Sequence, residues 1–129
     1  MTFDCDVVVV GGGQAGLAIA RCAQRRGRQV TVLDAEERIG DAWRERYDSL
    51  VLFTPAQYSG LPDTPLPAAR DTYPTKDEVA EYLAGYAAEH GLEVRSSCRV
   101  HSLTRAPHNH GFVLTTDLGA ITARQVVVA

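Results

Sequence analysis

The sequence lacks the features with which a chain crosses or enters a membrane, and it has no excess of positive charge. No apolar run approaches the roughly 20 residues that a spanning helix needs, and the residues after Met1 have neither the charged nor the apolar region of a signal peptide. The net charge of −3 leaves no basic surface for nucleic acid phosphates or anionic lipid. We therefore predict a cytoplasmic protein without nucleic acid or membrane partners.

Paired cysteines and grouped metal ligands are also missing. Cys5, Cys22 and Cys98 are odd in number and widely spaced in apolar surroundings, which favours a reducing compartment and buried thiols. No C-x-x-C pair is present to form a dithiol redox centre. His108 and His110 fall in a stretch with proline and glycine, so we predict a turn there and no metal site.

The residues that are present predict one α/β domain over 1–129, with a Rossmann-like parallel sheet. A length of 129 residues and a hydrophobic content of 45% are normal for a single domain with a core. An apolar strand, a helix with a small apolar face and a second apolar strand make a β–α–β start. The expected strands are 5–10, 29–34, 92–95, 99–105, 112–116, 121–122 and 125–129, and the expected helices are 15–26 and 75–90.

A long irregular excursion is expected between the second strand and the second helix. Residues 36–74 contain all but one of the six prolines and show no sustained helical period. Order returns where Thr75 and Glu78 make a capping box, and Gly91 closes the helix. The face of this helix that we expect to be buried consists of Val79, Tyr82, Leu83, Tyr86, Ala87 and His90.

The clearest motif is G-x-G-x-x-G, which lies between the first strand and the first helix. Gly11 allows a tight turn, Gly13 lets the backbone approach a pyrophosphate, and Gly16 lets the helix pack closely on the strand. The phosphates would then meet the free N–H groups at the helix start, where Gln14 and Ala15 follow. Any side chain at position 13 should block this approach.

An acidic residue follows the second strand at the distance that the motif requires. Asp34 lies 18 residues beyond Gly16, where a carboxylate can accept hydrogen bonds from both ribose hydroxyls and repel a 2′-phosphate. An ordinary residue at the end of a strand is the alternative interpretation of Asp34. The strand, glycines, helix and acid together favour an adenine dinucleotide without a 2′-phosphate, which is FAD or NAD.

The residues after the second strand distinguish between these two cofactors. A simple NAD domain would continue with a helix and another parallel strand. This chain instead has DAEERIGDAW at 34–43, YDSL at 47–50, LFTP at 52–55, LP at 61–62 and YPTK at 73–76. Over essentially its whole length it resembles the flavin-containing monooxygenase superfamily, in particular the bacterial and plant-like members.

The resemblance implies an FAD site and assigns roles to four further residues. Ala42 and Trp43 would lie along the ribityl and pyrophosphate part of FAD, and Arg38 would lie beside the adenosine. The strands from 99 to 122 would form a small β-meander, in which the backbone of Val100 would contact the adenine. A core aromatic residue that anchors the loop is the alternative for Trp43.

The resemblance also implies what a complete enzyme contains. It would reduce FAD with NADPH held by a second glycine-motif domain, and it would transfer oxygen to a small organic substrate. Residues 1–129 contain neither that domain nor the returning segment that completes the FAD site, so we expect the N-terminal portion only and assign no catalytic side chain to it. Pro55 stands where the animal-type members carry Asn, so we assign neither S- nor N-oxygenation from the resemblance.

Two other hypotheses remain open from the sequence. The chain could be an inactive or partner-dependent fragment that folds but binds FAD weakly, supported by an exposed hydrophobic patch where a missing segment would pack. It could instead be a stand-alone NAD-binding module. The Gly40-to-Trp43 element and the meander distinguish that module from an FAD domain, because a plain NAD domain has no use for them.

The ribose role of Asp34 is directly testable. Replacing it, as Asp34→Ala, should weaken FAD binding by about 1–3 kcal/mol, because hydrogen bonds to a charged group are lost. Isothermal titration of both proteins with FAD measures the difference. Equal affinities would exclude the ribose role.

Overall fold

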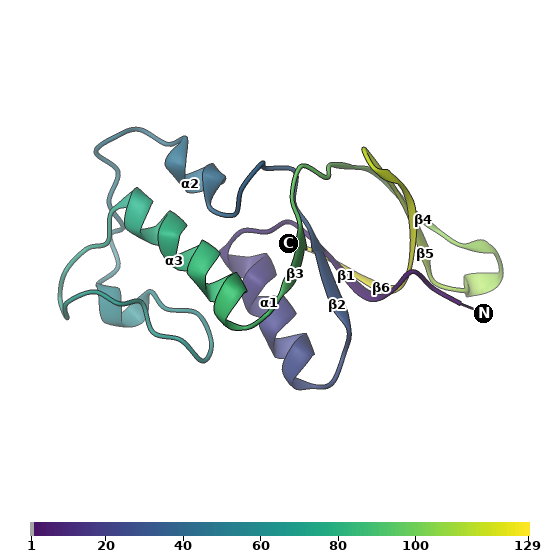
Figure 1. The fold of residues 1–129 in the computed structure, drawn as a ribbon, viewed down its shortest axis with the longest axis horizontal. Helices are drawn as coiled ribbons and strands as arrows, with labels where there is room; N and C mark the ends of the chain where they lie inside the picture. Colours follow the sequence, from purple (N-terminus) through teal and green to yellow (C-terminus); the bar gives the residue numbers. More distant parts are fainter. Residues whose placement is uncertain (1) are drawn as a thin grey trace.

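The structure is a computed structural model that describes residues 2–129, apart from the side chain of Asn109. Its centre is a six-stranded sheet with the order β3-β2-β1-β6-β5-β4 (Figure 1). The strands are β1 (Cys5–Val10), β2 (Val30–Leu33), β3 (Glu93–Arg95), β4 (Val100–Arg105), β5 (Phe112–Thr116) and β6 (Gly119–Val128). The pairs β3–β2, β2–β1 and β1–β6 are parallel, whereas β5 pairs antiparallel with β6 and β4.

The four consecutive valines at 7–10 of β1 suit its place between β2 and β6. Val8 and Val9 point to opposite faces and are both fully buried. On one face Val9 packs with Val32 and with Ala20 of α1 (Gln14–Arg25). On the other face Val8 packs with a cluster that β5 and β6 help to form. Both faces of β1 are thus covered at Val8 and Val9, whereas Asp6 near its start is partly exposed and pairs with Arg28 and Arg124.

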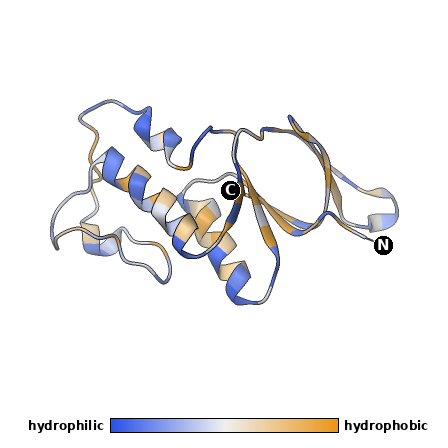
Figure 2. Ribbon diagram, viewed as in Figure 1, coloured by the Kyte–Doolittle hydropathy of each residue, from blue (hydrophilic) through white to orange (hydrophobic). Residues whose placement is uncertain are grey.

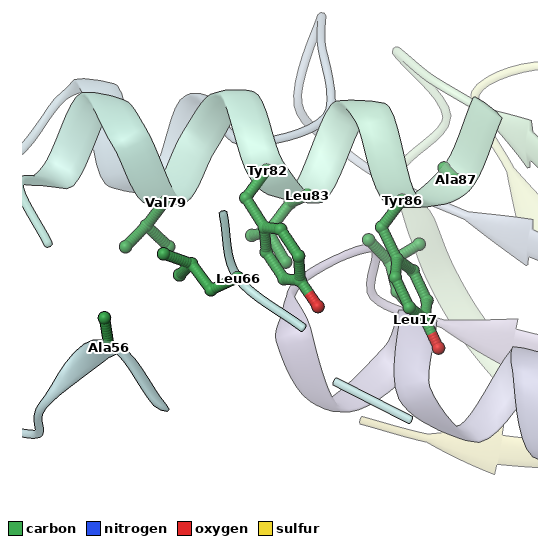
Figure 3. Close-up of a cluster of buried hydrophobic side chains, with 8 residues drawn as sticks. All are labelled: Leu17, Ala56, Leu66, Val79, Tyr82, Leu83, Tyr86 and Ala87. Atoms are coloured by element: carbon green, nitrogen blue, oxygen red, sulfur yellow. The ribbon is translucent and has the colours of Figure 1, made fainter. Parts of the chain in front are cut away.

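The second helix expected from the sequence is α3 (Lys76–Glu89). Its side chains form most of a separate hydrophobic core, to which α1 and the excursion also contribute. Its capping box is as predicted: the Thr75 hydroxyl accepts from the Glu78 N–H at 3.2 Å, and the Glu78 carboxylate accepts from the Thr75 N–H at 3.4 Å. Five of the six residues predicted for its buried face are buried, whereas His90 is only partly buried and Ala80, which was not predicted, is fully buried. Figure 3 shows the cluster of Leu17, Ala56, Leu66, Val79, Tyr82, Leu83, Tyr86 and Ala87.

The sequence predicts an apolar face of Gly16, Ile19, Ala20 and Ala23 on the first helix, and this prediction was incomplete. Leu17, which the apolar pattern did not include, is fully buried because α3 packs beside α1 and covers it. Ile19 is only half-buried. Figure 2 shows the strands coloured mainly as hydrophobic, whereas the last turn of α1 is hydrophilic.

The excursion is irregular as predicted, but it is firmly attached to α3. It contains one short helical turn, α2 (Asp41–Arg44), and a 3-10 turn, η1 (Ala56–Tyr58). The Tyr82 hydroxyl accepts from the backbone N–H of Leu61 at 2.7 Å, and the Tyr86 hydroxyl donates to the carbonyl of Pro62 at 2.7 Å. Two buried tyrosines therefore satisfy backbone groups that a long loop would otherwise leave unpaired.

Two predictions about the fold were wrong. Residues 121–122 and 125–129 do not form separate strands, because β6 runs unbroken from Gly119 to Val128. Its first half pairs with β5 and its second half with β1. Cys22 is exposed on α1, whereas Cys5 and Cys98 are buried as predicted. The turn around His108 is present as a short 3-10 segment, η2 (Pro107–Asn109).

The anchoring role of Tyr86 leads to a prediction about alkaline pH. Burial raises the pKa of Tyr86 to about 12, from an ordinary value of 10.0. A raised tyrosine pKa stabilises the fold fully below about pH 10, and this contribution is lost as the pH rises toward about 12. Tyr86→Phe should therefore lose about 1 kcal/mol at pH 7 and decline less steeply between pH 10 and 12.

Urea unfolding of both proteins at pH 7, 10 and 11 measures this difference. The neighbouring Tyr82, whose pKa burial also raises, is retained in both proteins and so serves as an internal control. Parallel stability curves above pH 10 would contradict the assignment of the alkaline loss to Tyr86.

Candidate nucleotide-binding site

The turn after β1 is as tight as the glycine motif predicts. Gly11 has φ of +110°, and a Cβ there would lie 2.6 Å from the carbonyl oxygen of Ala129. A Cβ on Gly16 would lie 1.8 Å from the carbonyl oxygen of Gly11, so α1 begins in direct contact with the turn. Both positions therefore require glycine for folding, whatever the site binds.

Gly13 differs from these two glycines. Its backbone is extended, at φ −80° and ψ −168°, and a Cβ added to it would have no described neighbour within 4 Å. It is the N-cap of α1, and no described side chain caps the helix there. Gln14 and Ala15 are exposed at the same end. Free N–H groups and the positive end of a 12-residue helix thus face open space.

Asp34 lies directly behind the glycine turn, at the carboxyl end of β2. Its side chain is 8% exposed, and a Cβ on Gly12 would lie 2.7 Å from its Oδ2 atom. The only hydrogen bond to its carboxylate from the described residues is long, 3.5 Å from the N–H of Glu36. The backbone of Asp34 is held on both sides, by the carbonyl of Arg95 and the N–H of Cys98 at 2.9 Å each.

Gly12 is a site residue that the sequence pattern did not identify. The motif treats position 12 as variable, yet any side chain there would displace the Asp34 carboxylate. The third consecutive glycine after the strand was the available signal.

Negative charge gathers beyond Asp34. Burial raises the pKa of Glu36, and the nearby carboxylates of Glu45, Asp34 and Asp41 raise it further. An additional anion such as a 2′-phosphate would be repelled by the same carboxylates, in agreement with the preference predicted from Asp34 alone.

Arg38 enters this acidic region from the turn that precedes α2. Its guanidinium is 3.1 Å from Oδ1 of Asp41 and is largely exposed, and Arg44 binds the same oxygen at 2.9 Å. Burial works to raise the pKa of Asp41, but the hydrogen bonds from Arg44 and Arg38 and the positive charge of Arg38 hold it below its usual value. Asp41 thus orients Arg38 at the edge of the site.

Trp43 is brought to the start of α1. Its Nε1 atom donates to Oε1 of Gln14 at 3.2 Å, across 29 residues of sequence. Both side chains line a cavity of about 210 Å³ with Leu52, Thr54 and Tyr58 among its other walls. Trp43 also packs against the α3 core, so its role as a loop anchor and its place beside the glycine turn are compatible. Ala42 is exposed.

Val100, the first residue of β4, is positioned by hydrophobic packing. It is partly buried against the cluster that contains Leu33 and Cys98, and Val10 packs on that cluster too. The β4–β5 register is irregular between Val100 and Ser102, which breaks regular pairing at the start of β4. The structure therefore brings together the carboxyl ends of β1 and β2 and the first residue of β4. Trp43 of α2 lies at the start of α1, beside this group.

The fold and this group of residues define the class of protein. A glycine turn at a helix N-terminus, followed by an acid at the end of the next parallel strand, is the arrangement of dinucleotide-binding α/β domains.

Comparison with known proteins places the chain within that class. Residues 8–129 match the model of the pyridine nucleotide-disulphide oxidoreductase family, so the chain belongs to this family. An uncharacterised CzcO-like oxidoreductase of Geobacillus kaustophilus is 44% identical over 96% of this chain and 35% of its own length. Indole-3-pyruvate monooxygenase YUCCA1 of Oryza sativa subsp. japonica is 40% identical over 95% of this chain and 30% of its own length.

Solved structures agree with these relatives. The flavin-containing monooxygenase from Stenotrophomonas maltophilia has a TM-score of 0.86 and 39% identity, over 96% of this chain and 37% of that one. An oxidised steroid monooxygenase bound to NADP has a TM-score of 0.84 and 30% identity, over 96% of this chain and 25% of that one. The predicted resemblance to the flavin-containing monooxygenase superfamily and the predicted fold class are confirmed. The chain spans about a third of the length of the curated relatives.

Some functional features are not found in the part of the chain that the structure describes. Among residues 2–129, no helix is long and apolar enough to cross a membrane. The same residues include no group of three or more side chains arranged to hold a metal ion.

Gly13 and Gly16 form a matched pair that separates binding from folding. Gly16→Ala should destabilise the chain by about 1–3 kcal/mol, because the new methyl group has no space. Gly13→Ala should lose less than about 1 kcal/mol in stability, yet weaken FAD binding at least roughly tenfold. Urea unfolding and FAD titration of both variants measure the two effects. A Gly13→Ala chain that binds FAD normally would contradict the phosphate role.

Proposed function

We propose that this chain binds FAD and serves as the FAD-binding portion of an NAD(P)H-dependent flavoprotein monooxygenase that acts on a small organic substrate. The observation that carries the proposal is the contact of Trp43 with Gln14. It places the Gly-x-x-Trp element, for which a plain NAD domain has no use, beside the open N-terminus of α1. The flavin-containing and indole-3-pyruvate monooxygenases among the similar proteins support the same assignment.

The residues at this edge suit the pyrophosphate of FAD. The proposed phosphate contacts are the backbone N–H groups at the start of α1, because Gly13 leaves open the space that a side chain would fill. The residues that we assign to this part of the cofactor are Gly11, Gly13, Gln14, Ala15 and Gly16.

The remaining proposed contacts are with the adenosine on one side of the pyrophosphate and with the ribityl chain on the other. The Asp34 carboxylate keeps acceptor capacity for ribose hydroxyls, and we assign Arg38, which pairs with Asp41, to the adenosine. We assign Val100 to the adenine through its backbone, and Ala42 and Trp43 to the ribityl portion. These residues bind and orient the cofactor, whereas the bound flavin itself supplies the redox chemistry.

NADPH is the proposed reductant of the complete enzyme. The NADP-bound steroid monooxygenase, 30% identical to this chain, supports this choice. We assign no residue of 1–129 to the reductant or to the organic substrate, and none to catalysis. A cytoplasmic location remains a prediction.

A second function has one structural observation in its favour. Residues 50–53 run antiparallel to 73–76, with Val51 bridged to Thr75 and Leu52 bonded to the carbonyl of Pro74. The side of this ribbon opposite Leu52 exposes Phe53 at 95% and Tyr73 at 54%. Exposed aromatic residues of this kind suit a fragment that binds FAD weakly until a partner surface covers them.

Visible absorption after gel filtration tests the proposed function. The purified chain, incubated with FAD, should elute with flavin bands near roughly 370 and 450 nm, and excess NAD should not remove them. Gly13→Ala provides the matched control, because it should elute folded and colourless. A folded but colourless wild-type chain would favour the partner-dependent alternative, and displacement by NAD would favour the NAD module.

A further inference from the structure

The chain contains a single lysine, and that lysine is buried. Of the 13 lysine and arginine residues, only Lys76 is a lysine, and it is 7% exposed. Lysine is among the residue types least often buried, because its compact ammonium is strongly hydrated. Such a group persists in an interior only where polar partners replace the water, so its contacts identify its role.

The ammonium of Lys76 binds the end of α2. Its Nζ atom donates to the carbonyl oxygen of Arg44 at 2.7 Å, and Asp77, which is largely exposed, lies 3.2 Å away. Arg44 is the last residue of α2, so a positive charge lies where the helix carbonyls have no partner within the helix. The buried contact therefore joins the first turn of α3 to the end of α2.

The other end of α2 is held against the same face of α3. Gly40, which precedes α2, has φ of +93°, and a Cβ there would lie 2.7 Å from the carbonyl oxygen of Ala80. Lys76 and Ala80 lie one turn apart on the same face of α3. Their partners, Arg44 and Gly40, are likewise four residues apart, at the two ends of α2. Close packing at one end and a charged hydrogen bond at the other thus hold this short helix at two points.

Trp43 lies between these two points of attachment. A helix of four residues has too few internal hydrogen bonds to keep its own geometry, so its position depends on α3. The indole reaches Gln14 only if α2 keeps that position. We infer that Lys76 is a positioning residue for the cofactor site, whose buried ammonium holds α2 so that Trp43 stays beside the glycine turn.

Lysine suits this position better than arginine. One carbonyl and one neighbouring carboxylate accept from two of the three N–H donors of a compact ammonium, whereas a planar guanidinium would bring five N–H donors into the same space. The inference rests on the proposed FAD function for its effect on binding, but its effect on Trp43 can be measured without a cofactor.

Trp43 is the only tryptophan in the sequence, so tryptophan fluorescence reports on the surroundings of this side chain alone. Lys76→Met keeps the apolar length of the side chain and removes the donor. We expect red-shifted emission and faster acrylamide quenching of Trp43 in the cofactor-free chain, and FAD binding that is weaker by about tenfold. Lys76→Arg should recover part of both properties. Arg70→Met, which removes an exposed positive charge from the excursion, should change neither.

The results separate this inference from the proposed function. If the wild-type chain does not bind FAD, the proposed function fails, but an altered Trp43 signal in Lys76→Met still supports the positioning role. Unchanged Trp43 emission and quenching in a folded Lys76→Met chain would overturn the inference, and so would unchanged FAD affinity when the wild type binds.

Acetylation of the wild-type chain gives a test that does not depend on a variant that folds. Lys76 is the only side-chain amine, so mass spectrometry of peptides distinguishes it from the terminal amine. The inference predicts slow acetylation of Lys76 in the folded chain and a red-shifted Trp43 after forced acetylation. Acetylation of the folded chain as fast as in urea would overturn it.

Discussion

The contact of α1 with the turn after β1 is the constraint on which the rest of the structure depends. Because Gly16 lies against the carbonyl of Gly11, the first turn of the helix cannot move without moving the end of the central strand. The free N–H groups of α1 are thereby held at the carboxyl edge of the sheet, where Asp34 also lies. In the proposed function, one close backbone contact thus sets the spacing between the phosphate and ribose contacts.

The carboxyl edge of the sheet has a positive region at the start of α1 and an acidic region next to it. The N-terminus of α1 has a positive dipole end and no capping side chain among the described residues, whereas Asp34, Glu36 and Asp41 crowd the adjacent region. Arg38 pairs with Asp41 within this region. A ligand in which a pyrophosphate adjoins an unphosphorylated ribose suits this distribution, which is why FAD suits the proposed site better than NADPH does.

The excursion is ordered by α3 and has little regular structure of its own. Tyr82 and Tyr86 bond the backbone near Leu61, while the start of the same helix binds α2 through Lys76. A helix with a strong capping box thus serves as the template for a segment rich in proline. Trp43 reaches the glycine turn as a result of this packing.

The sequence by itself determined the β–α–β start, the α3 capping box and the roles of Gly11 and Gly16 in the turn, because these depend on residues close together along the chain. Only the tertiary structure decided that residues 119–128 form one strand, since the two halves pair with different neighbours. It also decided that Gly12 accommodates Asp34 and that Lys76 is buried. Those features depend on which distant segments pack together, and neither periodicity nor motif spacing contains that information.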